Sequence, residues 1–280
     1  MRGRMEDGFL EVKKHSFKKY RMLEKYVDAC VHFQRKHRNF TYIDTHGGSG
    51  KVIFNDRFKD GSIQIAARIA HDFPCYVMEI DSDRYKCLKE AVKDFSNVIP
   101  IPGDCNKKID NILSKIPDWK FAFCFIDPDA LMYERNGVCC HQLSWETVEK
   151  IAQRKTELFL NFPLHQMKRL IGHYLKTSGS TTYEYEGALT DFFGTEKWKE
   201  AGLDRRKLLE LYISERLEVH YKYIGATLVK SRNVPLYYLI FASKHPVGAK
   251  IMRDIMRKEW GQLTLAEFDE VFPLERFIFE

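Results

Sequence analysis

The chain has 280 residues with a formal net charge of +6, and 44% of its residues are hydrophobic and 30% charged. These proportions are typical of a soluble globular protein and exclude a disordered chain. No apolar run approaches the ~20 residues that a membrane helix needs, and the N-terminus lacks the apolar segment of a signal peptide, so we expect a cytoplasmic protein that does not enter membranes.

A basic segment precedes the first predicted strand. Residues 1–38 hold eleven Lys/Arg against five Asp/Glu, whereas the rest of the chain is balanced. Residues 16–37 are expected to form a helix with Ser16 as its N-cap. The basic residues of interest are Lys13, Lys14, Lys18, Lys19, Arg21, Lys25, Arg35, Lys36 and Arg38. Such localised positive charge favours a polyanionic partner such as nucleic acid, and it fits a solvated helix face about equally well.

The first predicted strand ends at Asp44 and breaks into a glycine-rich turn. A Walker A loop is excluded because Thr45 stands where that motif needs its first glycine. A dinucleotide fingerprint is excluded because Ile53 stands where a third glycine is needed. The remaining pattern is Asp-x-x-x-Gly-x-Gly, formed by Asp44, Gly48 and Gly50, which is typical of class I S-adenosylmethionine (SAM) methyltransferases.

Strands and helices alternate through the first half of the chain. Strands are expected at residues 40–44, 74–78, 97–101, 121–126 and 158–160. Helices are expected after the turn at 60–62, around 85–92, at 109–116 and at 145–154. Each strand ends in a polar residue or a carboxylate. This alternation predicts a doubly wound parallel sheet that binds its ligand at the carboxyl ends of the strands.

The pattern changes after residue 163. Residues 164–218 read as helices and turns, with a loop at 178–182 and a helix at 208–217. Two long strands, 221–229 and 236–242, are joined so closely that they must be antiparallel. A basic helix at 246–259 and an apolar tail follow. We therefore expect an α/β, Rossmann-like class I methyltransferase sheet, mostly parallel with an antiparallel last strand pair.

Three regions follow from this pattern. They are a SAM-binding core with a basic N-terminal helix (1–163), a helical insertion (164–218), and a closing unit of antiparallel strands with a C-terminal helix and tail (219–280).

The acids at successive strand ends match the needs of SAM. Asp44 can accept hydrogen bonds from the ammonium group of the methionine end, and Gly48 and Gly50 let the backbone approach that end closely. Glu79 can accept from the ribose hydroxyls, and Ile80 beside it can pack on the adenine. Asp104 is placed to accept from the adenine amino group. Asp127 stands at the fourth strand end, where a methyl acceptor needs a polar group.

Two further residues complete the predicted catalytic set. Transfer from SAM is an in-line displacement in which the protein positions the acceptor and removes water. Asp127 is expected to accept N–H groups of an exocyclic amine, with the Pro128 carbonyl assisting. Asn161 offers an amide acceptor at the next strand end. An ordinary structural role for Asn161, as the turn residue that ends the strand, fits the sequence equally well.

The seven cysteines predict no metal site. They are Cys30, Cys75, Cys87, Cys105, Cys124, Cys139 and Cys140. None forms a C-x-x-C pair, and the scattered odd number fits reduced thiols. Cys139 and Cys140 precede His141, but partners at regular spacing are lacking, so a loop with ordinary thiols is favoured over a metal site.

The chain resembles the three-Cys-motif partner family of class I methyltransferase-like proteins. The residues that carry the resemblance are 42–44, 48–50, 61–62, 125–128, 161–163, 192–195, Trp198, Tyr212, 215–217 and 236–246. The resemblance covers nearly the whole chain, and the run from Tyr237 to Pro246 is its most specific part. It implies a SAM-binding Rossmann-like domain, a helical winged-helix-like portion, and association with a separate three-cysteine protein.

The chain also departs from the family pattern. Thr45, His46 and Gly47 replace a Gly-Phe-Ala run, so Thr45 and His46 are expected to line the cofactor loop. Asp129 and Ala130 replace Phe-Gly after the Asp-Pro pair. The first change alters the cofactor-loop lining without removing its glycines, whereas the second bears on the acceptor chemistry.

Taken together, these observations predict a SAM-dependent methyltransferase acting on RNA or DNA at a base nitrogen. One alternative is a protein that keeps the fold and acts with a partner without turnover. Another is a methyltransferase for a small molecule or protein, with residues 164–218 as a substrate lid.

Overall fold

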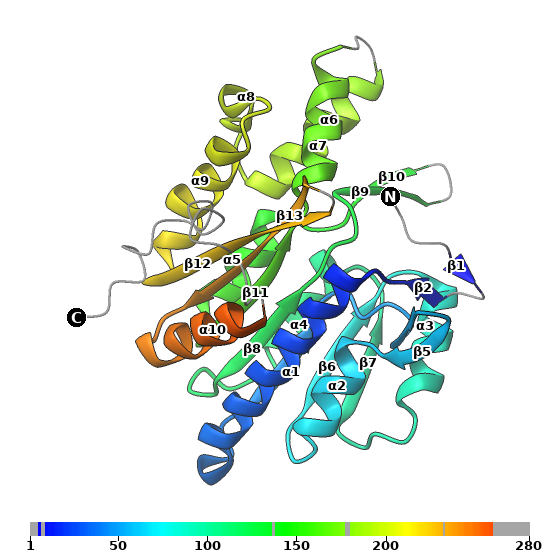
Figure 1. The fold of residues 1–280 in the computed structure, drawn as a ribbon, viewed down its shortest axis with the longest axis vertical. Helices are drawn as coiled ribbons and strands as arrows, with labels where there is room; N and C mark the ends of the chain where they lie inside the picture. The colour runs from blue at the N-terminus through cyan, green and yellow to red at the C-terminus, as the bar shows by residue number, and fades with distance from the viewer. Residues whose placement is uncertain (1–4, 7–8, 136–137, 177–179, 232, 260–280) are drawn as a thin grey trace.

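A seven-stranded sheet forms the centre of the computed structural model, which describes residues 5–6, 9–135, 138–176, 180–231 and 233–259 (Figure 1). The strands lie in the order β12-β13-β11-β8-β3-β6-β7. Their bounds are β3 Thr41–Asp44, β6 Cys75–Glu79, β7 Val98–Pro102, β8 Ala122–Ile126, β11 Thr156–Phe162, β12 Tyr223–Ser231 and β13 Val234–Ser243. Strands β7, β6, β3, β8 and β11 are parallel, and β13 is antiparallel to both β11 and β12.

This order confirms the predicted class I methyltransferase sheet. The chain starts at β3 in the middle, extends to one edge through β6 and β7, and returns to build the other side with β8 and β11. The carboxyl ends of β3 and β8 are therefore neighbours at the point where the strand order reverses. Ligands of open α/β sheets bind at such a point.

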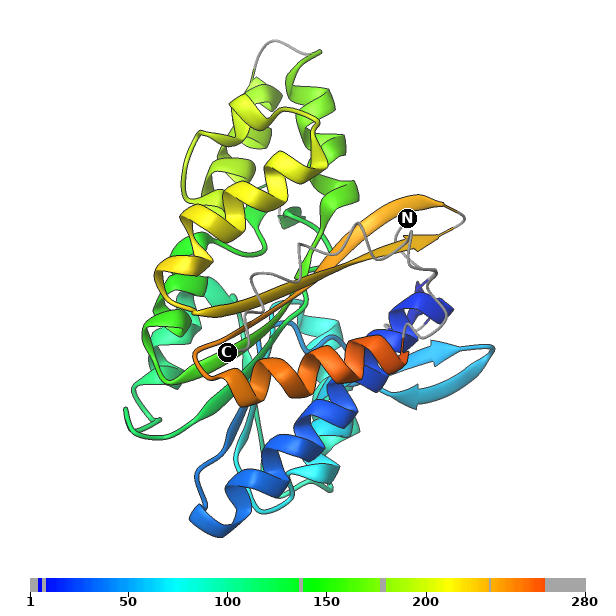
Figure 2. The ribbon, with the colours of Figure 1, turned by 60° about the vertical axis from the view of Figure 1, so that its left-hand side comes forward.

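Helices cover both faces of the sheet. Their bounds are α1 Lys14–Gln34, α2 Ser62–Ile69, α3 Ser82–Val92, α4 Cys105–Leu113, α5 Trp145–Gln153, α6 Leu164–Tyr174, α7 Ser180–Phe193, α8 Trp198–Ala201, α9 Arg205–Glu215 and α10 Pro246–Glu259, with 3₁₀ turns at Arg35–His37 and Leu217–Val219. Helix α1 packs between α2 and α10 on one face (Figures 1 and 2).

Side chains of the central strand β8 divide between two hydrophobic cores. Phe123 and Phe125 belong to the core under α1, α2 and α10, whereas Cys124 and Ile126 belong to the core under α4, α5 and the helical insertion. Strand side chains point alternately to opposite faces, so a strand buried on both sides must be apolar throughout. This explains the uninterrupted apolar run in the sequence.

The insertion is helical where it is described. Residues 164–176 and 180–218 form α6 to α9 and their connecting turns, and they rise beyond the sheet in Figure 2. Helix α7 begins at Ser180, inside the segment predicted as a loop, and residues 177–179 lie outside the described residues. The predicted apolar tail after residue 259 also lies outside them.

Two hairpins lie in stretches where the sequence predicts no strand. Strands β4 (Lys51–Phe54) and β5 (Arg57–Asp60) turn at Asn55 and Asp56, whose φ angles of 50° and 56° suit a hairpin turn. They join β1 (Met5–Glu6) and β2 (Phe9–Glu11) in a small sheet. The second hairpin, β9 (Met132–Arg135) and β10 (Val138–His141), follows β8 in the chain.

The predicted N-cap of the first helix is wrong. Helix α1 begins two residues before Ser16, and its N-cap is Lys13. The N-cap of α2 is Gly61, without a side-chain capping bond. The Ser62 hydroxyl donates instead to Asp44, at 2.6 Å. Ser62 therefore supports the strand end that precedes the glycine turn rather than capping its own helix.

Candidate functional site

Asp44 shapes the glycine turn from below. One carboxylate oxygen accepts from the hydroxyls of Ser62 (2.6 Å) and Tyr42 (3.3 Å), and the other accepts from the His46 backbone N–H at 3.2 Å. The side chain is fully buried, and burial raises the pKa of Asp44 to about 7. Asp44 thus stands at the predicted strand end, but its hydrogen bonds are all to protein groups. Its contribution to a bound ligand would therefore be indirect, through the glycine turn that it holds in place.

We expect Asp44→Asn to flatten the pH dependence of stability. The folded protein keeps the Asp44 proton up to about pH 7, whereas the unfolded chain releases it near pKa ~3.9. Between these values the unfolded chain binds fewer protons, so the free energy of unfolding falls as pH rises, by up to about 1.4 kcal/mol per pH unit from this group.

Denaturant unfolding at pH 5, 6, 7 and 8 measures this effect. Burial also raises the pKa of Glu79 and Glu157, which remain in the variant, so the difference between the two curves isolates Asp44. The control is Asp110→Asn, whose carboxylate is 64% exposed. A wild-type slope in Asp44→Asn would show that this carboxyl does not titrate between pH 5 and 7.

The glycine turn is closely packed on one side and open on the other. A Cβ at Gly47 would stand 2.1 Å from a methyl of Val77, and one at Gly61 would stand 2.6 Å from the carbonyl oxygen of Gly50. Gly48 has a φ of +59°, and a Cβ there would meet no atom within 4 Å. The turn therefore presents open backbone at Gly48, as a loop that cradles a ligand must.

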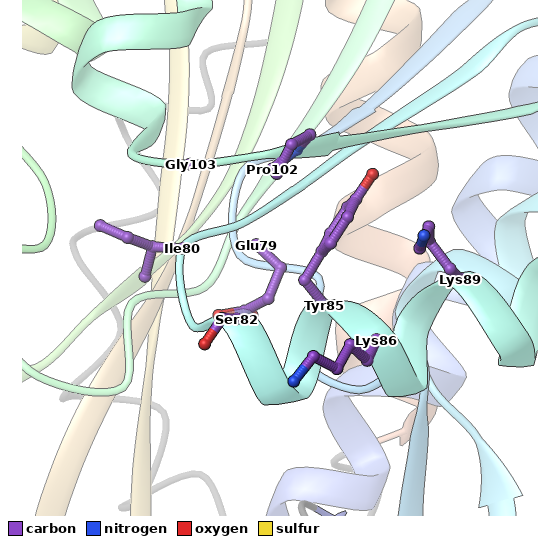
Figure 3. A pocket seen from close by; sticks show the side chains of 8 residues that line it. All are labelled: Glu79, Ile80, Ser82, Tyr85, Lys86, Lys89, Pro102 and Gly103. Carbon is purple, nitrogen blue, oxygen red and sulfur yellow. The ribbon is translucent and has the colours of Figure 1, made fainter.

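Glu79 holds the neighbouring strand end. Its carboxylate accepts from the Asp81 backbone N–H at 2.8 Å, and burial raises its pKa. Glu79 and Ile80 line a pocket of about 330 Å³ together with Pro102 and Gly103. The other lining residues are Ser82, Tyr85, Lys86 and Lys89 of α3. In Figure 3, Tyr85 points toward Pro102 whereas Ile80 points away from the helix.

The predicted adenine contact, Asp104, is the N-cap of α4. One of its oxygens accepts from the Asn106 backbone N–H at 2.9 Å, and the side chain is only partly buried. Asp104 does not line the pocket beside Glu79. The structure therefore assigns Asp104 a capping role, away from the pocket beside Glu79.

His46 is tied into a buried network. Its Nδ1 lies 2.7 Å from the Thr45 hydroxyl, and its Nε2 lies 3.3 Å from the Gln142 carbonyl oxygen. Burial lowers the pKa of His46, which favours the neutral ring. A neutral ring satisfies both contacts when Thr45 donates to Nδ1 and Nε2–H donates to Gln142. His46 thus links the glycine turn to Gln142, which follows β10.

Asp127, Pro128 and Asn161 come together as predicted. The Asn161 side-chain N–H donates to Asp127 at 2.9 Å and to the Pro128 carbonyl at 3.3 Å. These two residues follow β8, and Asn161 lies near the end of the adjacent β11. The Pro128 carbonyl already receives the amide of Asn161. It therefore links Pro128 to the cluster of Asp127 and Asn161, whereas the sequence predicts that this carbonyl assists the acceptor directly.

Lys19 is the site residue that the sequence analysis misplaced. It was assigned to the exposed basic stripe, but only 6% of the residue is exposed, and its ammonium lies 2.6 Å and 2.5 Å from the two oxygens of Asp127. The spacing of residues along the helix does indicate that Lys19 is buried. Lys19 lies four residues before Leu23 and seven before Tyr26, both of which are buried, so it belongs to the apolar face of α1.

The basic segment is partly neutralised in other places as well. Arg21 and Lys25 both pair with Glu259 of α10, and Arg35 lies 3.9 Å from Asp72. Lys13 and Lys14, at the start of α1, are exposed. The positive surface near the candidate site is therefore narrower than charge counting predicted.

The residues around the second hairpin also have partners. Asp129, which replaces the aromatic residue of the family pattern, pairs with Arg84 of α3 at 3.2 Å. His141 pairs with Asp191 of α7 at 2.5 Å. Among the described residues no group of three or more His, Cys, Asp or Glu side chains could hold a metal ion, and no described helix is long and apolar enough to cross a membrane.

Comparison with solved structures identifies a shared fold. Protein LPL1258 from Legionella pneumophila superposes with a TM-score of 0.51 at 12% identity, covering 86% of this chain and 92% of that chain. Weaker similarity connects the chain to an O-methyltransferase from Bacillus cereus in complex with SAH (TM-score 0.43, 13% identity, 84% and 83% covered). A putative rRNA methylase from Clostridium thermocellum gives 0.42 at 12% identity, with 83% and 99% covered. No protein-family model and no curated protein matches the sequence.

Proposed function

We propose that this protein binds SAM and transfers its methyl group to a nitrogen of a nucleic-acid base. The observation that carries the proposal is the convergence of four strand ends at the reversal of the strand order. The glycine turn, Glu79 and the cluster of Asp127, Pro128 and Asn161 all project from this edge. This edge is where a sheet of this order binds its ligand.

The residues present suit SAM. The open backbone at Gly48 gives the methionine end of SAM a surface on which to lie, and Asp44 keeps the turn in place. Glu79 and Ile80 line the pocket proposed to take the ribose and adenine. When bound, SAM supplies an activated methyl group on its sulfonium. The protein positions the acceptor and excludes water.

Asp127 is the proposed catalytic residue. As a carboxylate it accepts N–H groups, so it can hold an acceptor amine in line with the methyl group and take up the released proton. Asn161 orients it from the adjacent strand. These contacts favour transfer to nitrogen over transfer to carbon, because a carbon acceptor offers no N–H to the carboxylate.

We expect SAM to raise the melting temperature and Glu79→Gln to reduce that rise. At a hundredfold excess over Kd, stabilisation is about 2.7 kcal/mol, or roughly 5–10 °C for a domain of this size. Glu79→Gln keeps an acceptor for the Asp81 N–H but loses the charge offered to the ribose, so about 3–5 °C of the rise should disappear. Glu90→Gln is the control, because Glu90 lies on α3 with its carboxylate 72% exposed. An equal rise in both variants would place the cofactor elsewhere.

The nucleic-acid proposal is supported by the exposed lysines at the start of α1. We expect affinity for RNA or DNA to fall steeply with salt, and Lys13→Gln/Lys14→Gln to reduce the slope of log K against log salt by about 0.9 per lost phosphate contact on duplex DNA. Arg206→Gln/Lys207→Gln, two exposed residues of α9, is the matched control. A flat salt dependence, or equal slopes in the two double variants, contradicts the proposal.

One observation favours the alternative of a binding protein without turnover. The Lys19 ammonium engages both oxygens of the proposed catalytic carboxylate. Transfer of tritiated methyl groups from SAM into RNA, DNA and protein fractions distinguishes a methyltransferase from a binding protein without turnover. Nucleoside mass spectrometry then identifies the modified base. SAM binding without transfer into any fraction would favour the alternative, in which a separate three-cysteine protein is the proposed partner.

A further inference from the structure

The environment of the Lys19 ammonium is that of a binding site for an amine. Only 7% of the Lys19 side chain and 12% of the Asp127 side chain are exposed. Both carboxylate oxygens accept from the ammonium. A buried ammonium persists only where a counter-charge and further contacts replace its water.

Three aromatic rings surround the same nitrogen. The Lys19 Nζ lies 5.6 Å from the centre of the Tyr20 ring, 5.8 Å from Phe125 and 5.9 Å from Tyr237. Ring faces carry partial negative charge and attract cations within about 6 Å. The rings come from α1, β8 and β13, so the cage is built by three separate parts of the fold around the end of the catalytic strand.

One hydrogen-bond acceptor at this site is left over. The Asn161 side-chain N–H faces two acceptors, Asp127 and the Pro128 carbonyl, which fixes the orientation of the amide. Its carbonyl oxygen is buried and has no partner among the described residues. Buried acceptors are nearly always satisfied, so an unsatisfied one beside a carboxylate indicates a missing donor.

We propose that this cage is the acceptor pocket of the enzyme, that it is specific for an amine, and that Lys19 is its resident occupant. The proposal rests on the function inferred above and adds the place where the acceptor amine binds and the role of Lys19 in it. The acceptor amine displaces the Lys19 ammonium from Asp127 and donates to Asp127 and to the free oxygen of Asn161. Lys19 is therefore a positioning residue that holds the carboxylate ready until an acceptor arrives.

Replacement of the lost side chain by a free amine tests the pocket directly. Lys19→Ala removes three methylenes and the ammonium, which together correspond to n-propylammonium. We expect propylammonium chloride at ten times its Kd to raise the melting temperature of Lys19→Ala by roughly 3 °C above the effect of equal NaCl. Wild type should show no such excess, because its own lysine fills the pocket.

Two controls separate an amine pocket from a simple cavity. 1-Propanol fills the same space without a charge, so it should give less than a third of the rise. The variant Lys19→Ala/Asp127→Asn keeps the cavity but loses the carboxylate, and propylammonium should not stabilise it beyond salt. Equal rises with propanol, or no excess rise in a folded Lys19→Ala, would overturn the proposal.

A second measurement uses a variant that keeps the side-chain volume. Lys19→Met leaves Asp127 without its ammonium. SAM carries a positive sulfur and its demethylated product SAH does not, so the ratio of SAM to SAH affinity should rise about tenfold over wild type in calorimetric titrations. Lys115→Met, an exposed lysine after α4, should leave it unchanged.

The two experiments fail independently. An unchanged ratio in Lys19→Met would show that Lys19 is remote from the reacting sulfur and would overturn its place in the acceptor pocket. If wild type binds neither SAM nor SAH, the proposed function fails. The propylammonium result still decides whether the cage binds amines.

Discussion

Asp127→Ala is expected to abolish methyl transfer and to destabilise the protein. The substitution removes the acceptor of the amine N–H groups, which in general acid–base catalysis is worth about 10²–10⁴-fold in rate. It also leaves Lys19 as an unpaired ammonium inside the fold. Breaking a buried ion pair by removing one partner costs about 3–5 kcal/mol. Denaturant unfolding and tritiated methyl transfer measure the two losses separately.

A double variant separates chemistry from stability. Replacing both members of a buried ion pair by apolar residues is often neutral, because no charge is then left without its partner. Asp127→Ala/Lys19→Met should therefore regain most of the lost stability while methyl transfer stays absent. Asp110→Ala, which breaks the exposed pair with Lys150, should change stability by no more than about 1 kcal/mol.

Either of two results would contradict this account. Methyl transfer by Asp127→Ala within tenfold of wild type would show that this carboxylate is not the catalytic group. A double variant no more stable than Asp127→Ala would show that the ion pair with Lys19 does not exist in solution.

Residues at the ends of strands could be predicted from sequence because their position depends on local pattern alone. A buried parallel strand reads as an apolar run, and the residue that ends the run lies at the ligand edge whatever the rest of the chain does. Asp44, Glu79 and Asp127 were identified in this way, and the structure places all three at that edge. The roles of their side chains could not be predicted from the pattern, because those roles depend on partners such as the Ser62 hydroxyl and the Asp81 backbone N–H.

Lys19 could not be placed because its partner lies 108 residues away in the sequence. Charge counting treats every lysine as solvated, and that assumption fails when the helix face that carries it packs over a strand end. The hairpin of β4 and β5 was missed for a different reason. Its turn uses Asn55 and Asp56 rather than an Asn-Gly or Asp-Gly pair, so the usual hairpin signal is absent.

Gly48→Ala is expected to weaken SAM binding more than it weakens the fold. Gly48 has a positive φ and open space around the position of a Cβ. An alanine in such a backbone conformation costs about 1–2 kcal/mol, and no packing clash adds to that cost. The added methyl group would instead occupy the surface proposed to receive the methionine end of SAM. We expect about a hundredfold loss of SAM affinity by calorimetry, about 2.7 kcal/mol of binding free energy.

Gly202→Ala is the control for the conformational cost of placing an alanine at a positive φ. Gly202 follows α8 with a φ of +55°, and a Cβ there also meets no atom within 4 Å, but it lies in the helical insertion. The free energy of unfolding should fall at least as much in Gly202→Ala as in Gly48→Ala. The SAM affinity of Gly202→Ala should equal that of wild type. Equal SAM affinity in the two variants would mean that the cofactor does not approach the backbone at Gly48. The glycine turn would then be a structural corner of the sheet, and Glu79 would have to hold SAM from the α3 side alone.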